Sequence, residues 1–228
     1  MNLRTNRKEA RDPLVLAITG ASGALYAARL MQVLCHQSID VHLAISPSGA
    51  AVIRQEIGVT LDLQRPNLTE LVGHVPAWSN PSDRQRIEAT DWPALLKDRF
   101  QYHRYDDYMT PIASGSFRTS AMIICPCSGS TLSGIARAAA SNLIQRAAEV
   151  HLKEHRKLVL VPRETPLSVL QLENMRAIAA AGGVILPAMP GWYHGVDSPD
   201  SLIDFVVSRI LDQVGLDNQM IHRWKETS

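Results

Sequence analysis

A strand, a glycine-containing turn, a helix and a second strand follow one another near the start of the chain, and this succession constrains the fold most. Residues Leu14–Ile18 form a wholly apolar run, as expected for a strand covered on both faces of a parallel sheet. The turn Gly20–Gly23 follows, and apolar side chains then recur at helical spacing over Ala24–Leu34. A second apolar run, Val41–Ile45, completes the unit. The chain is therefore predicted to open a doubly wound α/β sheet.

The later segments continue the alternation of strands and helices. Between Pro66 and Tyr108, prolines, charges and scattered aromatic residues interrupt it, so we expect a partly helical excursion there. Strands are predicted at Ala121–Cys125, Leu158–Val161 and Val184–Leu186, and helices at Leu132–Ala140, Leu143–His155, Val169–Ala181 and Ser201–Val214.

Length and charge exclude several classes of protein. The 228 residues suit one α/β domain, placed at 14–216 between an N-terminal arm (1–13) and a C-terminal tail (217–228). With 23 Lys and Arg against 22 Asp and Glu, no basic field attracts nucleic acid or anionic lipid. The apolar runs are far shorter than the roughly 20 residues of a membrane span. The polar first dozen residues lack a signal-peptide core, and three cysteines make no disulfide framework, so we expect a cytoplasmic protein.

The turn Gly20-Ala21-Ser22-Gly23 stands where a strand hands over to a helix. Backbone N–H groups and the helix dipole make such a place an anion site at the carboxyl edge of a parallel sheet. A plain tight turn, with Ser22 capping the helix, explains the same residues equally well. The tetrapeptide alone does not decide between the two readings.

Hydroxyl-rich runs flank the strand predicted at Ala121–Cys125. One is Ser114-Gly115-Ser116-Phe117, and the other, Cys127-Ser128-Gly129-Ser130-Thr131, opens the next helix. Such donors suit a phosphate or the polar edge of a ring system, although helix capping by Ser128 or Ser130 is also expected. No cation neighbours Cys125 or Cys127 in the sequence to lower their pKa values, so these thiols are expected to pack rather than react.

Arg146, Lys153, Arg163 and Glu164 are the densest charge group in an otherwise apolar stretch. Arg163 and Glu164 follow a predicted strand, the position at which such sheets build their sites, where an Arg can hold a phosphate and a Glu can move a proton. Arg146 and Lys153, seven residues apart on one helix, also fit a solvated stripe.

The run His151-Leu152-Lys153-Glu154-His155 matches the H-x-x-E-H pattern of inverzincin metalloproteases. The sequence offers no clear third ligand for a metal. We therefore interpret the run as an exposed helix end, where the dipole favours His and Lys.

Taken together, these segments resemble the UbiX family of flavin prenyltransferases from about Val15 to Asp212. The order and spacing of the matching runs carry the resemblance. They are TGASGALYAARL (Thr19–Leu30), ASGSF (Ala113–Phe117), PCSGSTLSGIA (Pro126–Ala136), NLIQRAAEVHLKEHRKLVLVPRETPLS (Asn142–Ser168), LENM (Leu172–Met175) and WYH (Trp192–His194).

The resemblance implies a three-layer, Rossmann-like (flavodoxin-like) single domain and a homododecamer with sites at subunit contacts. It implies reduced FMN as prenyl acceptor, dimethylallyl phosphate as donor, no metal, and delivery of the product to a UbiD-type decarboxylase. Glu164 is the implied acid/base group, with Ser22 and Glu56 as further catalytic residues. The implied FMN-binding residues are Gly20, Ala21, Ser22, Ser46, Ser128, Gly129, Ser130, Thr131 and Arg163. The implied prenyl-phosphate-binding residues are Tyr108, Arg146, Lys153, Tyr193 and Arg209.

Some residues depart from the family pattern. Ala28 stands where glycine is common, Trp192 replaces a Phe, and Tyr108 replaces a tryptophan of the prenyl pocket. The stretch Gly73–Tyr105 has no match. Two alternatives share the fold and FMN binding: a flavin-dependent cysteine decarboxylase, which typically carries a PASANT-like motif absent here, and a non-catalytic FMN carrier, which would not need Glu164.

Overall fold

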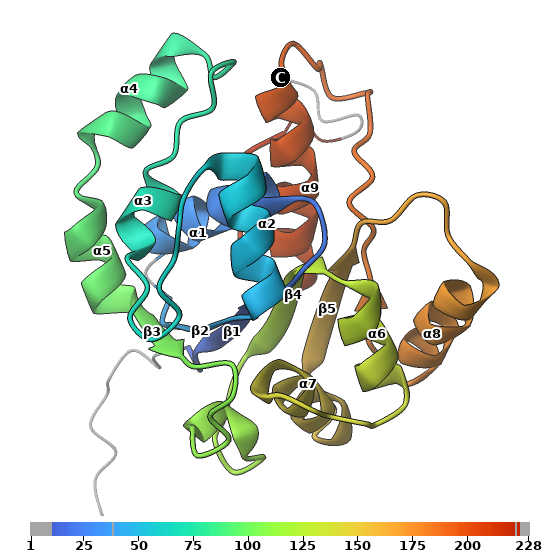
Figure 1. The fold of residues 1–228 in the computed structure, drawn as a ribbon. Helices are drawn as coiled ribbons and strands as arrows, with labels where there is room; N and C mark the ends of the chain where they lie inside the picture. Colours follow the sequence, from blue (N-terminus) through green and yellow to red (C-terminus); the bar gives the residue numbers. More distant parts are fainter. Residues whose placement is uncertain (1–10, 38, 222, 224–228) are drawn as a thin grey trace, which may run out of the picture.

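The strands of the described residues run parallel in a single sheet. The computed structural model describes residues 11–37, 39–221 and 223. The strands are β1 (Leu14–Ile18), β2 (Val41–Ile45), β3 (Phe100–His103), β4 (Ala121–Cys127), β5 (Lys157–Pro162) and β6 (Val184–Ile185). Their order is β3-β2-β1-β4-β5-β6 (Figure 1). The order reverses between β1 and β4, and ligands of open α/β sheets bind at such a switch point.

Helices cover both faces of this sheet. They are α1 (Ala24–His36), α2 (Pro47–Ile57), α3 (Leu68–Val72), α4 (Pro81–Ala89), α5 (Trp92–Arg99), α6 (Gly129–Ala136), α7 (Leu143–Lys153), α8 (Val169–Ala180) and α9 (Pro199–Gln213), with a 3₁₀ turn η1 (Pro111–Ala113). In the view of Figure 1, α1 and α9 lie on one side of the sheet and α7 on the other. None of the helices in the described part of the chain is long and apolar enough to cross a membrane.

Alternation along the strands builds the two halves of the core. Leu14, Leu16 and Ile18 pack with apolar residues of α1 and α9, whereas Val15 and Ala17 face those of α6 and α7. All five residues of β1 are buried, as expected for a strand covered on both faces. Burying one such Val, Leu or Ile side chain contributes about 1.5–3 kcal/mol before conformational entropy is counted.

Parallel pairing brings the carboxyl ends of the strands to one edge. Leu16 pairs with Leu43 of β2 and with Ile123 of β4, so the three central strands are in register. The segments that follow β1, β2, β4 and β5 therefore meet along this carboxyl edge, and the segments that precede the strands lie along the opposite, amino edge.

The three-layer parallel α/β fold predicted from the sequence is confirmed, with two additions. Helix α2 lies in a stretch for which no element was predicted. Strand β3 lies inside the excursion, where it pairs with β2 through partners such as Leu43 and Tyr102. The excursion is otherwise helical, as expected, and carries α3, α4 and α5. The N-terminal arm falls largely outside the described residues.

One helix boundary was predicted wrongly. Helix α6 covers Gly129–Ala136, whereas the apolar spacing predicted Leu132–Ala140. The helix begins at Gly129, directly after its cap Ser128. It ends at Ala136 and cannot continue through Ala138, whose φ of 51° is left-handed. The hydroxyl-rich run therefore supplies both the cap and the first turn of α6.

Candidate active site

Thr19 ties together the two turns at the switch point. Its hydroxyl donates to the carbonyl oxygen of Pro126 at 2.9 Å and accepts from the backbone N–H of Ser128 at 2.8 Å. Thr19 is buried. The turn after β1 and the start of α6 are thus fixed relative to each other by a hydrogen-bonded side chain.

The N-terminus of α2 packs directly on the end of β1. A Cβ atom on Gly20 would lie 2.5 Å from the side chain of Ser48, and one on Gly49 would lie 2.6 Å from the carbonyl oxygen of Ile18. Only glycine permits this approach. Ser46 caps the helix, because its Oγ accepts from the N–H of Gly49 at 3.0 Å and contacts Ser48 Oγ at 3.1 Å.

The N-terminus of α6 presents a second group of hydroxyls at the same edge. Ser128 Oγ accepts from the N–H of Thr131 at 3.3 Å, which confirms the predicted cap. It also lies 3.0 Å from Thr131 Oγ1 and 3.1 Å from Ser130 Oγ. Two capped helix N-termini, both rich in hydroxyl groups, therefore face the switch point.

The N-terminus of α1 is occupied by a carboxylate from the same chain. Glu56 accepts hydrogen bonds from the N–H groups of Gly23, at 3.0 Å, and Ala24, at 2.8 Å. The interpretation of Ser22 as the cap of this helix was wrong: Gly23, with a φ of 125°, is the capping position, and Glu56 supplies the acceptor. The positive end of the helix dipole is thereby partly neutralised before any ligand binds.

Arg163 joins the end of β5 to the turn after β1. Its Nε donates to the carbonyl oxygen of Ser22 at 3.4 Å. The adjacent Glu164 is exposed, and its Oε1 accepts from the N–H of Thr165 at 3.2 Å. A small pocket beside Glu164 is lined by Leu167, Met175 and Met189, among others. The structure thus gathers the predicted FMN residues, Glu164 and Glu56 along the carboxyl edge.

Cys125 and Cys127 are buried strand residues, as predicted. Burial raises the pKa of the Cys127 thiol to about 12 and the pKa of Cys125 still further. Both thiols are therefore protonated and unreactive at neutral pH.

A second group of predicted site residues lies on the face covered by α7. Arg146 Nε donates to the carbonyl oxygen of Ala113 at 3.2 Å. Lys153 Nζ contacts Glu154 Oε1 at 2.5 Å, in an exposed pair at the amino edge of the sheet. Tyr108 is exposed in the segment between β3 and η1, which runs past the start of α7, where Leu143 N–H donates to Tyr105 O.

A third group lies on the opposite face, on and beside α9. The Tyr193 ring meets the rings of His194 and Phe205 edge to face, at centroid distances of 6.1 and 5.7 Å. Phe205 and Arg209 are one helical turn apart, so Tyr193 and Arg209 share a side of α9. Arg209 Nη1 contacts Asp212 Oδ2 at 2.7 Å.

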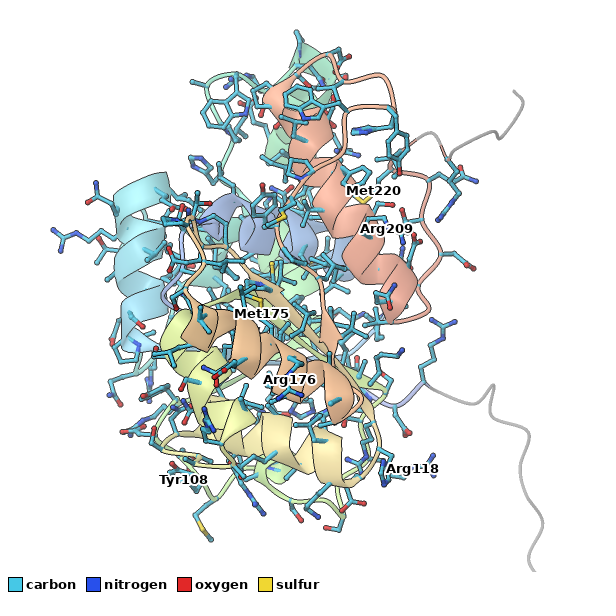
Figure 2. All side chains as sticks on the ribbon, turned by 90° about the vertical axis from the view of Figure 1, so that its right-hand side faces the viewer. Tyr108, Arg118, Met175, Arg176, Arg209 and Met220 are labelled. Atoms are coloured by element: carbon cyan, nitrogen blue, oxygen red, sulfur yellow. The ribbon has the colours of Figure 1, made fainter. Side chains whose placement is uncertain are left out.

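The three groups do not meet within one chain. Lys153 precedes the amino end of β5 and Glu164 follows its carboxyl end, and this strand of 6 residues is about 20 Å long. Arg209 and Tyr108 lie far apart in the molecule (Figure 2). A site using Lys153, Arg209 and Glu164 together requires more than one copy of the chain.

His151 does not behave as the exposed helix-end residue expected from the H-x-x-E-H run. It is buried, its Nδ1 lies 2.7 Å from the carbonyl oxygen of Ala147, and its Nε2 lies 2.9 Å from Thr119 Oγ1. Since a carbonyl only accepts, Nδ1 carries the proton and Nε2 accepts from the hydroxyl. Within the described residues, no group of three or more His, Cys, Asp or Glu side chains could hold a metal ion.

Comparisons with known proteins match this architecture. Residues 2–211 match the Flavoprotein family model. The chain is 43% identical over 211 residues to the flavin prenyltransferase UbiX of Halalkalibacterium halodurans, covering 92% of both chains. It is 42% identical over 217 residues to the flavin prenyltransferase UbiX of Pseudomonas aeruginosa, covering 94% of this chain and 95% of that protein.

Solved structures are similar over nearly the whole chain. AnUbiX (PadA1), in complex with FMN and dimethylallyl pyrophosphate, has a TM-score of 0.75 at 34% identity, with 96% of this chain and 100% of that chain covered. The dodecameric FMN-dependent UbiX-like decarboxylase from Escherichia coli O157:H7 has a TM-score of 0.74 at 35% identity, with 93% and 99% covered. Peptidyl-cysteine decarboxylase EpiD, at 15% identity and a TM-score of 0.51, shares the fold alone.

Proposed function

The chain belongs to the UbiX-type flavin prenyltransferases of the flavoprotein family, and from this we infer that it transfers a dimethylallyl group from dimethylallyl phosphate to reduced FMN. The observation that carries the assignment is the contact between Arg163 and the Ser22 carbonyl. Arg163 thereby reaches the turn after β1, beside the hydroxyl-lined helix starts where α/β folds hold nucleotides, and an arginine there is proposed to bind the phosphate with Glu164 as its neighbour.

The chain's donors at the carboxyl edge fit FMN. Hydroxyls at the starts of α2 and α6, those of Ser46, Ser128, Ser130 and Thr131, together with Arg163, suit a phosphate and the polar edge of a flavin ring. Because Glu56 already occupies the start of α1, we assign the FMN phosphate to the hydroxyls at the starts of α2 and α6. Gly20, Ala21 and Gly129 have small or no side chains, so a ligand can approach their backbone closely there. Reduced FMN supplies the nucleophilic N5 and the adjacent ring carbon.

Glu164 is proposed as the acid/base group. It stands two residues beyond a buried strand, so its backbone is fixed while its carboxylate stays accessible. A carboxylate so placed can accept a proton as the new ring closes and return one to the departing phosphate. Ser22, in the turn after β1, and Glu56, which is hydrogen-bonded to the end of that turn, are proposed to assist Glu164 in catalysis. Glu56 does so at least by holding the turn through Gly23 and Ala24.

The prenyl phosphate is proposed to bind between copies of the chain. Arg146 and Lys153 offer positive charge on the α7 face, with Tyr108 as an aromatic wall, and Tyr193 and Arg209 offer a ring and a charge on the α9 face. A leaving phosphate is stabilised by several cations at once, which would dispense with a metal. A homododecamer is proposed to bring the three groups together; the UbiX-like decarboxylase from Escherichia coli O157:H7 is dodecameric.

The product, prenylated FMN, is proposed to pass to a UbiD-type decarboxylase. The cytoplasm is proposed as the site of action. Cys35, Cys125 and Cys127 are all free and buried, which agrees with a compartment that keeps thiols reduced.

An anaerobic assay separates this function from the two alternatives. The protein is incubated with reduced FMN and either dimethylallyl phosphate or dimethylallyl pyrophosphate, and in parallel with a peptide that ends in cysteine. A prenyltransferase consumes a prenyl donor and leaves the peptide intact. Decarboxylation of the peptide would identify a cysteine decarboxylase, and FMN binding without either reaction would identify a carrier.

A further inference from the structure

The segment Ala113–Thr119, from the end of η1 to the start of β4, is held by side chains of α7 and of the turn that follows it. Arg156, in the turn after α7, donates from Nη2 to the carbonyl oxygen of Gly115 at 2.6 Å and from Nη1 to that of Phe117 at 2.7 Å. Its Nη1 also lies 3.4 Å from Thr119 Oγ1. One guanidinium thus fixes two backbone carbonyls of the segment, two residues apart.

The backbone that carries Arg156 is itself held by hydrogen bonds. Its backbone N–H donates to the carbonyl oxygen of His151 at 2.8 Å. His151 is buried and bridges Ala147 to Thr119 through its two ring nitrogens. Arg156 therefore holds the segment at Gly115 and Phe117, and His151 holds it at Thr119. Arg146 adds a fourth contact, at Ala113.

The segment lies directly against Lys153. A Cβ atom added to Gly115 would lie 2.8 Å from Lys153 Nζ and 2.3 Å from Glu154 Oε1. The backbone at Gly115 therefore sets the space in which the ammonium group of Lys153 sits. A shift of this backbone by about an ångström would change what Lys153 can reach.

We propose that Arg156 is a positioning residue for the prenyl-phosphate site: by holding the Gly115 and Phe117 carbonyls, it places the Ala113–Phe117 backbone against Lys153 and Arg146. This rests on the proposed function of Lys153 and Arg146. Arg156 directs its guanidinium at protein carbonyls, so its effect on the substrate is indirect. Lysine, a single-point donor, cannot hold both carbonyls and is expected to replace it only in part.

The test compares Arg156→Met and Arg156→Lys with the control Arg118→Met. Arg118 belongs to the same segment, but its side chain is 81% exposed and pairs at the surface with Asp12, at 3.2 Å. Arg156→Met is expected to raise KM for dimethylallyl phosphate by about tenfold or more, with kcat changed less than about threefold. FMN affinity should be unchanged. Arg156→Lys should fall between Arg156→Met and the wild type, and Arg118→Met should match the wild type.

Hydrogen exchange supplies a second readout that does not depend on turnover. The amides of Ser116 and Phe117 should exchange faster in Arg156→Met, while those of β4 stay protected. Unchanged KM together with unchanged exchange would overturn the proposal, and so would a loss of kcat with KM intact. If Arg156→Met does not fold, Arg156→Lys carries the test, and it must raise KM because lysine cannot hold the Gly115 and Phe117 carbonyls together. If the wild type prenylates no flavin, the proposed function fails while hydrogen exchange still tests the anchoring role.

Discussion

The carboxylate of Glu56, near the end of α2, lies on the first turn of α1 and accepts a hydrogen bond from the N–H of Ala24 at 2.8 Å. This contact ties together two helices that follow neighbouring strands. It also fixes the end of the turn Gly20–Gly23, because the N–H of Gly23 donates to the same carboxylate. The turn is therefore shaped by a residue more than thirty positions away in the sequence.

Glu56→Ala should loosen this turn. Loss of a helix cap costs about 1 kcal/mol, which corresponds to a fall in Tm of roughly 2–4 °C for a chain of this size. FMN should bind more weakly, because the turn is part of its site. Thermal unfolding and flavin titration check both effects, with Gln55→Ala, an exposed neighbour on the same helix, as the control. Equal melting of the two variants would contradict the capping role.

Glu164→Gln should separate binding from chemistry. The amide keeps the size of the side chain but cannot exchange protons at neutral pH, so FMN affinity should be retained while prenylation falls by about a hundredfold or more. Glu173→Gln, on exposed α8 surface, is the matched control. Wild-type turnover by Glu164→Gln would remove this residue from the mechanism.

Two inactive variants should restore activity when they are mixed. Lys153→Ala and Glu164→Gln alter opposite edges of the sheet, so a site formed between copies can draw an intact Lys153 from one and an intact Glu164 from another. Random assembly of equal amounts predicts roughly a quarter of the sites to be complete. Prenylation by oligomers co-assembled from both variants is the measurement. Mixtures as inactive as either variant alone would contradict a shared site.

Stability should fall on mild acidification because of buried histidines. Burial lowers the pKa of His151 to about 4, from an ordinary value of 6.5. Between these two pH values, His151 binds a proton in the unfolded chain but not in the folded one. The contribution of His151 to the free energy of unfolding is therefore fully present above about pH 6.5 and declines toward pH 4. The loss is on the order of 3 kcal/mol for His151. His103, with its pKa lowered to about 4 by burial and by the neighbouring His42, acts in the same direction.

Urea unfolding at pH 7, 6 and 5 measures this decline. His151→Asn should be less stable than the wild type at pH 7 and should lose less on acidification, because the residue that titrates is gone. A free energy of unfolding that stays flat or rises from pH 7 to pH 5 would contradict the assignment.

Local pattern was enough to predict the parts of this protein that short-range physics determines. The buried strand, the turn and α1 follow from residues Leu14 to Leu34, and the cap by Ser128 from its position after a strand. Helix α2 could also have been predicted, since Ser46 followed by Pro47 is a helix-start signal. Strand β3 gives little signal, because this edge strand of 4 residues has one buried side chain, that of His103.

Contacts between distant segments were beyond reach from the sequence. Nothing near Glu56 indicates that it caps α1, and nothing near Arg156 indicates that it holds Gly115. His151 sits in a charged run, yet the helix turns it into the core. The separation of Lys153 from Glu164 could have been predicted, because the strand expected at Leu158–Val161 lies between them.

The mass of the flavin recovered after anaerobic turnover tests the central claim most directly. The protein is supplied with reduced FMN and dimethylallyl phosphate, and the flavin is released and analysed by mass spectrometry, with Glu164→Gln treated identically. Wild-type protein should yield FMN carrying one added prenyl group, and the variant should yield almost none. Recovery of unmodified FMN alone from the wild type, with either the monophosphate or the pyrophosphate donor, would contradict the assignment of this chain as a flavin prenyltransferase.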